Sequence, residues 1–121
     1  MLKKLLSREE ILKADDRKIV DMNIPEWGGN VRIRMISASE REEYSLMLVK
    51  KENGKFVETN DNIRAKLVSF CLVDEKGEKI FSKADIAALS GKCDVVIRRI
   101  YQKAQELNKL VEGVEEETAK N

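Results

Sequence analysis

The sequence predicts an α+β fold, in which an N-terminal antiparallel β-hairpin packs on a small bundle of about five helices. Two stretches of alternating apolar and polar residues flank the turn "PEWGG", and this period indicates two half-buried strands. Over residues 92–111 the apolar residues recur at intervals of three and four, which predicts a long amphipathic C-terminal helix. The length and the absence of internal repeats favour one domain over residues 1–111.

The N-terminal part is expected to form a short helix followed by the hairpin. Ser7 and Glu10 have the spacing of a capping box, which predicts a helix over about residues 8–14. In the turn "PEWGG", the proline lacks a backbone donor and the glycines permit positive φ angles. The apolar positions of the two strands are Val20, Met22 and Ile24 before the turn, and Val31, Ile33 and Met35 after it.

Two further helices are expected in the middle of the chain. Ser37 and Ser39 each precede a glutamate by three residues, so both are candidate caps for a helix from about Ser39 to Lys51. The following polar loop, with Asn53-Gly54 at its tip, is either a small excursion or a second hairpin. The next helix, over residues 62–73, is capped by Asn60 or Asp61. Its apolar stripe consists of Ile63, Leu67, Phe70 and Cys71.

The C-terminal part holds two more helices. After a turn at Gly77 and an extended Ile80-Phe81, Ser82 caps a short helix that ends at Ser90-Gly91. The last helix carries the strongest periodic signal, and burial of each large apolar side chain contributes about 1.5–3 kcal/mol. Its inward positions are Cys93, Val96, Ile97, Ile100, Tyr101, Ala104, Leu107 and Val111. Residues 112–121 are acidic and are expected to be a flexible tail.

The composition argues against several functions. A formal net charge of +1 gives no reason to expect a nucleic acid or a membrane as partner. The chain has no histidine, which excludes Ser-His-Asp and Cys-His catalysis. Cys71 and Cys93 lie at apolar helix positions, so we expect two buried free thiols in the cytoplasm and no metal site. The sequence therefore predicts neither an enzyme nor a cofactor.

The hairpin holds the candidate surface for self-association or another partner: Trp27, Arg32, Arg34 and Lys18. Arg32 and Arg34 project from one strand face, with Lys18 and Asp21 across the hairpin. This face is either a solvated surface with cross-strand ion pairs or a polar subunit interface. Trp27 either folds back as a lid on the core or docks on a neighbouring molecule.

The order of these segments resembles the tail assembly chaperones of long-tailed phages and prophages of Gram-positive bacteria. The resemblance covers roughly residues 7–111 and depends on "IPEWGGNVRIRMIS", "SEREEY", "NIRAKLVSFCLVDEKGEKIFSKADIAAL" and "IYQKAQELNKL". It implies a non-enzymatic factor that binds the tape measure protein and keeps it soluble before the tail tube polymerises. It also implies spiral or ring-like self-association in the host cytoplasm and absence from the mature virion.

Family members often exist in two lengths, the longer made by a −1 ribosomal frameshift, so the resemblance adds a longer form and the tail tube protein as partners. Ala119-Lys120-Asn121 is compatible with the slippery codons GCA-AAA-AAC, and reading the gene tests this hypothesis. A structural tail or head-tail connector component retained in the virion is the alternative function. Gene order next to a long tape measure gene distinguishes the two functions.

Overall fold

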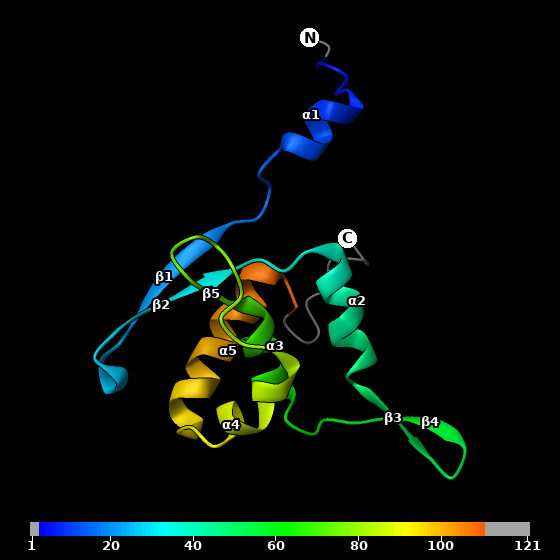
Figure 1. Ribbon diagram of the computed structural model, residues 1–121, viewed down its shortest axis with the longest axis vertical. Coiled ribbons are helices and arrows are strands. Elements are labelled where there is room, and N and C mark those ends of the chain that lie inside the picture. The colour runs from blue at the N-terminus through cyan, green and yellow to red at the C-terminus, as the bar shows by residue number, and fades with distance from the viewer. Residues whose placement is uncertain (1–2, 111–121) are drawn as a thin grey trace, which may run out of the picture.

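A three-stranded antiparallel sheet packs against helices in the computed structural model, which describes residues 3–110 of the chain (Figure 1). The described part is a mixed α and β structure with five α-helices and a second, two-stranded sheet. The helices are α1 (Arg8–Lys13), α2 (Ala38–Leu46), α3 (Ile63–Cys71), α4 (Ile86–Ser90) and α5 (Asp94–Asn108). The predicted fold class is confirmed.

The predicted hairpin is present. Strands β1 (Ile19–Ile24) and β2 (Gly29–Arg34) pair antiparallel, with Asp21 directly opposite Arg32. Ile24 and Ile33 are fully buried and turn the apolar face of the hairpin toward the core. Between the strands, residues 25–27 form a 3₁₀ turn that ends at Gly28, whose φ angle of 74° favours glycine.

The sheet has a third strand that the sequence did not predict. Strand β5 (Leu72–Val73) pairs with β2, so β2 is the central strand and the order is β1-β2-β5. These two residues were expected to end a helix. Because a short buried apolar run has no distinctive period, it fits a helix end and a strand equally well. Among the described residues, β1 therefore has a strand neighbour on one side only.

Helix α2 ends at Leu46 rather than near Lys51, because the chain turns into a second hairpin. Strands β3 (Val49–Glu52) and β4 (Lys55–Glu58) pair antiparallel. Asn53 and Gly54 join them with φ angles of 51° and 80°, which is the pattern of a two-residue turn with both φ angles positive. Of the two alternatives for this loop, the hairpin is the one observed.

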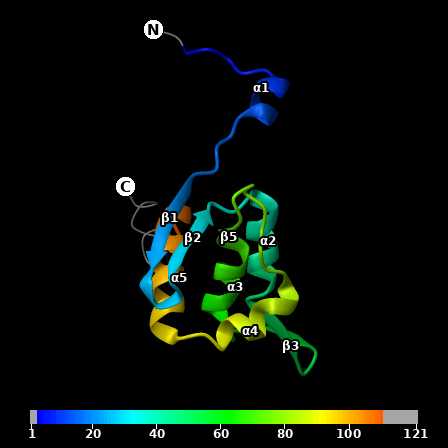
Figure 2. The same ribbon diagram turned by 60° about the vertical axis from the view of Figure 1, so that its left-hand side comes forward.

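Helix α3 lies at the centre of the molecule, between α2, α4 and α5 (Figure 2). It buries its last two turns on all sides rather than along one stripe, and Ser69 is buried with them. Its N-cap is Asn62, which makes no side-chain capping bond, so the predicted caps Asn60 and Asp61 are wrong.

Helix α5 covers the core with Val96, Ile97, Ile100 and Ala104. It begins at Asp94, so Cys93 precedes the helix and is exposed, which corrects the expectation of two buried thiols. Cys71 is buried as predicted. The expected acidic tail over residues 112–121, and Val111, lie outside the described residues.

Helix α1 projects away from the rest of the chain, and both views show it at one end of the molecule (Figures 1 and 2). Ser7 caps it as predicted: the Ser7 hydroxyl accepts a hydrogen bond from the Glu10 amide, and the Glu10 carboxylate accepts one from the Ser7 amide. None of the residues of α1 is buried. Within residues 3–110, no helix combines the length and the apolar character needed to cross a bilayer.

Candidate functional site

Arg32 lies on the polar face of the first hairpin and pairs with Asp21 across the strands. Its Nε and Nη2 atoms donate to the Asp21 carboxylate at 2.7 and 3.0 Å. The hydrogen bonds from Arg32 hold the pKa of Asp21 below its ordinary value. This is the cross-strand ion pair of a solvated strand face, and both partners remain accessible.

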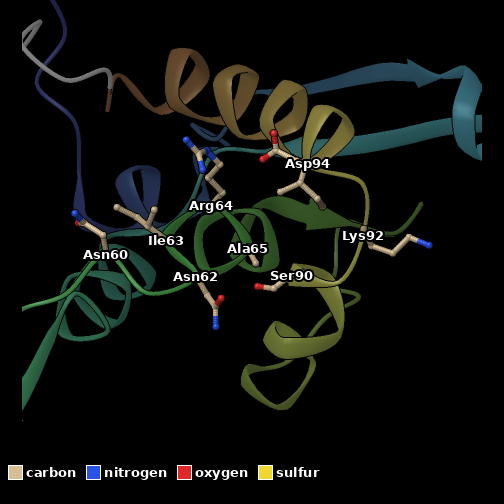
Figure 3. Close-up of a pocket in the computed structure, with 9 residues that line it drawn as sticks. Asn60, Asn62, Ile63, Arg64, Ala65, Ser90, Lys92 and Asp94 are labelled. Atoms are coloured by element: carbon tan, nitrogen blue, oxygen red, sulfur yellow. The ribbon is translucent and has the colours of Figure 1, made fainter.

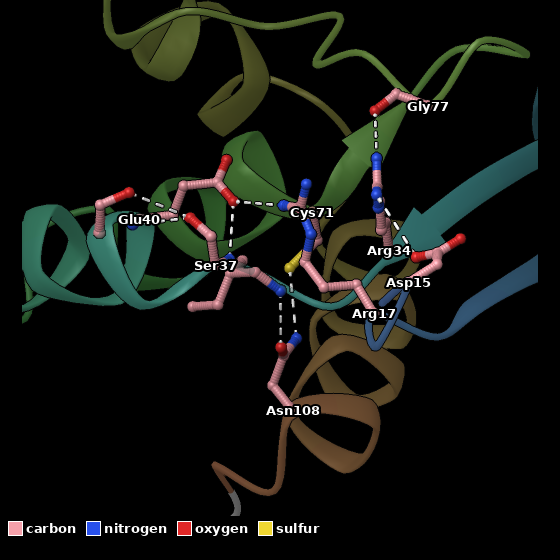
Figure 4. A network of polar contacts seen from close by, with 10 residues as sticks. Asp15, Arg17, Arg34, Ser37, Glu40, Cys71, Gly77 and Asn108 are labelled. Atoms are coloured by element: carbon pink, nitrogen blue, oxygen red, sulfur yellow. Dashed lines mark hydrogen bonds and ion pairs between the residues drawn. The ribbon is translucent and has the colours of Figure 1, made fainter. Parts of the chain in front are cut away.

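Arg34 has a different role from Arg32, although the two residues share a strand face. Arg34 Nη1 donates to the Gly77 carbonyl oxygen at 2.9 Å, and its Nη2 lies 3.9 Å from the Asp15 carboxylate (Figure 4). Its side chain is only 21% exposed. The guanidinium therefore fastens the turn after β5 to the central strand, instead of facing solvent beside Arg32.

Trp27 lies at the tip of the hairpin, beside the start of α5. It is 36% exposed, and the Lys92 ammonium is 5.8 Å from the centre of its ring, within reach of a cation–π contact. Next to it, the Glu26 carboxylate accepts two hydrogen bonds from Arg99 of α5, at 2.9 and 2.8 Å. These bonds lower the pKa of Glu26 from its ordinary value of 4.5 to about 2. The tip is therefore fixed to α5.

Lys18 lies at the other end of the hairpin from Trp27. Its carbonyl oxygen accepts a hydrogen bond from the Met35 amide at 2.9 Å. Its neighbour Ile19 is 46% exposed on the edge of β1 that has no strand neighbour among residues 3–110. The four predicted residues are thus spread along the hairpin: Trp27 at the tip, Arg32 on the polar face, Arg34 under a turn, and Lys18 at the open end. Sequence reasoning missed Glu26 and Arg99, which are 73 positions apart.

A polar network joins the segment after α1 to the core (Figure 4). Arg17 Nη1 donates to Glu40 Oε1 at 3.1 Å, and the same oxygen accepts the Ser37 amide at 2.8 Å. Arg17 is therefore held at the N-terminal end of α2, where Ser37 caps the helix. This contact fixes the point from which α1 leaves the molecule.

Asn108 closes the same network from the end of α5. Its Oδ1 atom accepts the Ile36 amide at 2.8 Å, and its Nδ2 atom donates to the Ala104 carbonyl at 2.9 Å and lies 3.6 Å from Cys71 Sγ. Burial raises the pKa of the Cys71 thiol to about 12, so this thiol is protonated at neutral pH. The arrangement is structural and does not activate a nucleophile.

One hollow lies between the start of α3 and the start of α5 (Figure 3). It has a cavity volume of about 240 Å³, below the roughly 300–1,000 Å³ of typical ligand pockets. Its lining mixes Asn60, Asn62 and Ser90 with the charged residues Arg64, Lys92 and Asp94. Within the described residues, no group of three acidic, cysteine or histidine side chains lies close enough to hold a metal ion.

A larger and more apolar groove lies where the C-terminal end of α2 meets β3 and α4. Its volume is about 540 Å³, and its apolar lining consists of Leu46, Met47, Val49 and Ile86. Leu46 is 71% exposed, and Phe56 on the adjacent β4 is 77% exposed. The rim carries Glu43, Lys66 and Lys83. Apolar side chains therefore line this groove and continue onto the adjacent hairpin surface.

The comparisons with known proteins identify the family of this chain. The family model described as phage tail assembly chaperone matches residues 13–121. Among solved structures, the tail assembly chaperone of bacteriophage HK97 matches with a TM-score of 0.58 and 18% sequence identity, over 82% of this chain and 90% of that chain. At that identity the likeness shows the fold. No curated protein matches the sequence. Because the family model spans most of the chain, this protein belongs to the phage tail assembly chaperone family.

Proposed function

We propose that this protein binds the tape measure protein of a phage tail and keeps it soluble until the tail tube polymerises. Family membership over residues 13–121 carries this proposal. A tape measure protein is a long, apolar, helical polypeptide, so its chaperone must present apolar surface of its own. The chain exposes several large apolar side chains although 37% of its residues are charged, which supports this proposal.

The proposed action is binding, without catalysis or a cofactor. It takes place in the host cytoplasm, and the chaperone leaves before the virion is complete. A longer, frameshifted form of the chain and the tail tube protein are further proposed partners.

Self-association is part of the proposed function, and the first hairpin is a proposed contact surface. The edge of β1 is unpaired on its outer side within the described residues, and Lys18, Arg32 and Trp27 are accessible along the hairpin. Unpaired strand edges invite pairing with another chain. Arg34 is not an accessible part of this surface. It contributes indirectly, by a hydrogen bond that holds the turn at Gly77.

The reversal Arg32→Glu separates an interface from a solvated face. If the polar face contacts a second copy, the variant gives smaller particles by light scattering, whereas thermal stability changes little because the Arg32–Asp21 pair is exposed. Unchanged particle size removes Arg32 from the interface. Arg34→Glu is unsuitable as a partner variant, since it also breaks the bond to Gly77.

Co-expression with the tape measure protein of the same phage tests the main proposal. The tape measure protein should be soluble and co-purify with the chaperone, and it should aggregate when expressed alone. Equal solubility with and without the chaperone contradicts the proposal. Mass spectrometry of purified virions tests the structural alternative, which requires this protein to be abundant in the finished particle.

A further inference from the structure

Helix α1 is capped at its start, but none of its residues is buried against another part of the described chain, residues 3–110. It is only six residues long, whereas isolated helices shorter than about 12–15 residues are marginal in water. Its complete capping box favours the helix. Four apolar side chains on and before it are exposed: Leu5 at 94%, Leu6 at 56%, Ile11 at 57% and Leu12 at 66%. Such a helix is stabilised when a second surface covers these side chains.

The base of this arm is fixed to the molecule. Arg17 is bonded to Glu40 at the N-terminal end of α2, and the Lys18 carbonyl is bonded to the Met35 amide. From this anchor the arm extends outward in both views (Figures 1 and 2). The family model begins at residue 13, so most of α1 lies outside the part of the chain that it matches.

The elements that line the apolar groove, the end of α2, β3 and the start of α4, lie at the opposite end of the molecule from α1 (Figure 1). Val49 and Lys51 are two residues apart on β3, and Phe56 pairs with Lys51, so Val49 and Phe56 share one face of the hairpin. This face continues the groove that Leu46, Met47 and Ile86 line. Among residues 3–110, the molecule therefore exposes an apolar helix at one end and an apolar groove at the other.

We propose that the α1 arm of one copy docks in the α2–β3–α4 groove of a second copy. The charges are complementary: α1 carries Glu9 and Glu10 in its first turn and Lys13 in its last, and the groove rim carries Lys66, Lys83 and Glu43. The two halves of this contact are different surfaces, so it is head-to-tail and leaves a free arm and a free groove at the ends of every chain of copies. The inference rests on the proposed self-association and assigns it to the arm and the groove, as an alternative to the hairpin contact that Arg32→Glu tests.

A mixing experiment tests the proposal, because a head-to-tail contact can be broken from either side. Leu12→Asp disables the arm, and Leu46→Asp disables the groove; both residues are exposed, so neither substitution should unfold the protein. Phe56→Asp is a second groove variant, and Val95→Asp on α5 is the control at an exposed apolar position elsewhere. Particle mass is measured by size-exclusion chromatography with light scattering.

The wild type and Val95→Asp should form large particles that grow with concentration. Leu12→Asp, Leu46→Asp and Phe56→Asp should each be monomeric, with self-association weakened by about tenfold or more, because each places an unpaired charge in an apolar contact. An equal mixture of Leu12→Asp and Leu46→Asp should give dimers and nothing larger. The intact arm of Leu46→Asp fills the intact groove of Leu12→Asp. The dimer then has only a disabled arm and a disabled groove left, so no further copy can add.

Three results overturn the proposal: a monomeric wild type, arm and groove variants with wild-type particle mass, or a mixture that stays monomeric. Co-expression with the tape measure protein keeps the two proposals apart. If Leu46→Asp loses the tape measure protein but keeps wild-type particle mass, the groove belongs to the client. If the wild type solubilises no client but the mixture forms dimers, the chaperone function fails and the arm contact stands.

Discussion

The ion pair between Glu26 and Arg99 links the first hairpin to α5 through two hydrogen bonds. Hydrogen bonds from Arg99 lower the pKa of Glu26 from 4.5 to about 2 in the folded protein. A carboxylate whose pKa is lower in the folded than in the unfolded protein stabilises the fold when the pH is above its unfolded-state pKa. The stabilisation is lost as the pH falls toward its folded-state pKa. The contribution of Glu26 should therefore be fully present above about pH 4.5 and disappear between pH 4.5 and about 2.

The variant Glu26→Gln measures this contribution. The free energy of unfolding of the variant should lie below that of the wild type by a constant amount above pH 4.5, and the difference should shrink as the pH falls toward 2. Glu42→Gln, at an exposed position of α2, is the control and should follow the wild type. A difference between Glu26→Gln and the wild type that stays constant down to pH 2 contradicts the assignment.

Arg32 and Arg34 form a matched pair for a second prediction. Arg34→Met removes the hydrogen bond to the Gly77 carbonyl and should lower the free energy of unfolding by about 1–3 kcal/mol, because the side chain is largely buried. Arg32→Met breaks an exposed ion pair and should lower the free energy of unfolding by less than Arg34→Met does. Urea denaturation of both variants checks the ranking. If both variants lose the same free energy of unfolding, the Arg34–Gly77 hydrogen bond stabilises the fold no more than the exposed Arg32–Asp21 ion pair does.

The sequence indicated the partner of Arg32 but not that of Arg34. If the two strands form a hairpin, their alternating pattern puts Asp21 on the same face as Arg32. The structure places Asp21 directly opposite Arg32. Gly77 is 43 positions from Arg34, and its carbonyl carries no side-chain signal. Glu26 and Arg99 are 73 positions apart and could not be paired from their positions in the chain. Long-range polar contacts depend on packing, which local patterns do not encode.

At the scale of elements, the start of α2 yields a prediction that separates two serines. Ser37 makes both bonds of the capping box with Glu40, whereas the Ser39 hydroxyl lies 3.2 Å from that of Ser37. Ser37→Ala should therefore lower the free energy of unfolding by about 1 kcal/mol, within the usual range for a lost N-cap. Ser39→Ala should change it by less than half as much. Chemical denaturation of both variants decides, and a larger loss for Ser39→Ala contradicts the observed cap.

The elements that the sequence predicted well have a strong periodic pattern and a defined start. The first hairpin alternates over both strands, and α5 repeats its apolar positions over 15 residues. The errors fall where apolar runs are short. Leu72–Val73 forms β5 because β2 offers an unpaired edge there, and α2 ends early because Asn53-Gly54 favours a tight hairpin. Both outcomes depend on partners that lie outside the local window.

At the scale of the whole molecule, the candidate surface was the least predictable feature. The apolar residues of α1 and α5 look alike in the sequence. In the structure, α5 buries its apolar stripe, whereas no residue of α1 is buried. Likewise, Leu46 and Phe56 are exposed because α2 ends early and the β3–β4 hairpin projects from the body. Which apolar face remains free is a property of the assembled chain, and only the structure reveals it.

The proposed contact between copies makes stability depend on protein concentration. If α1 is covered in the groove of a neighbour only when both copies are folded, association favours the folded state by mass action. Above the dissociation constant, each tenfold rise in concentration should add about 1.4 kcal/mol per contact, so the Tm of the wild type should rise by several degrees. Differential scanning calorimetry over a hundredfold range of concentration measures this slope. Leu12→Asp should have a Tm independent of concentration, whereas the Tm of Val95→Asp should rise with concentration as in the wild type. If the Tm of Leu12→Asp rises as steeply as that of the wild type, the contact lies away from α1.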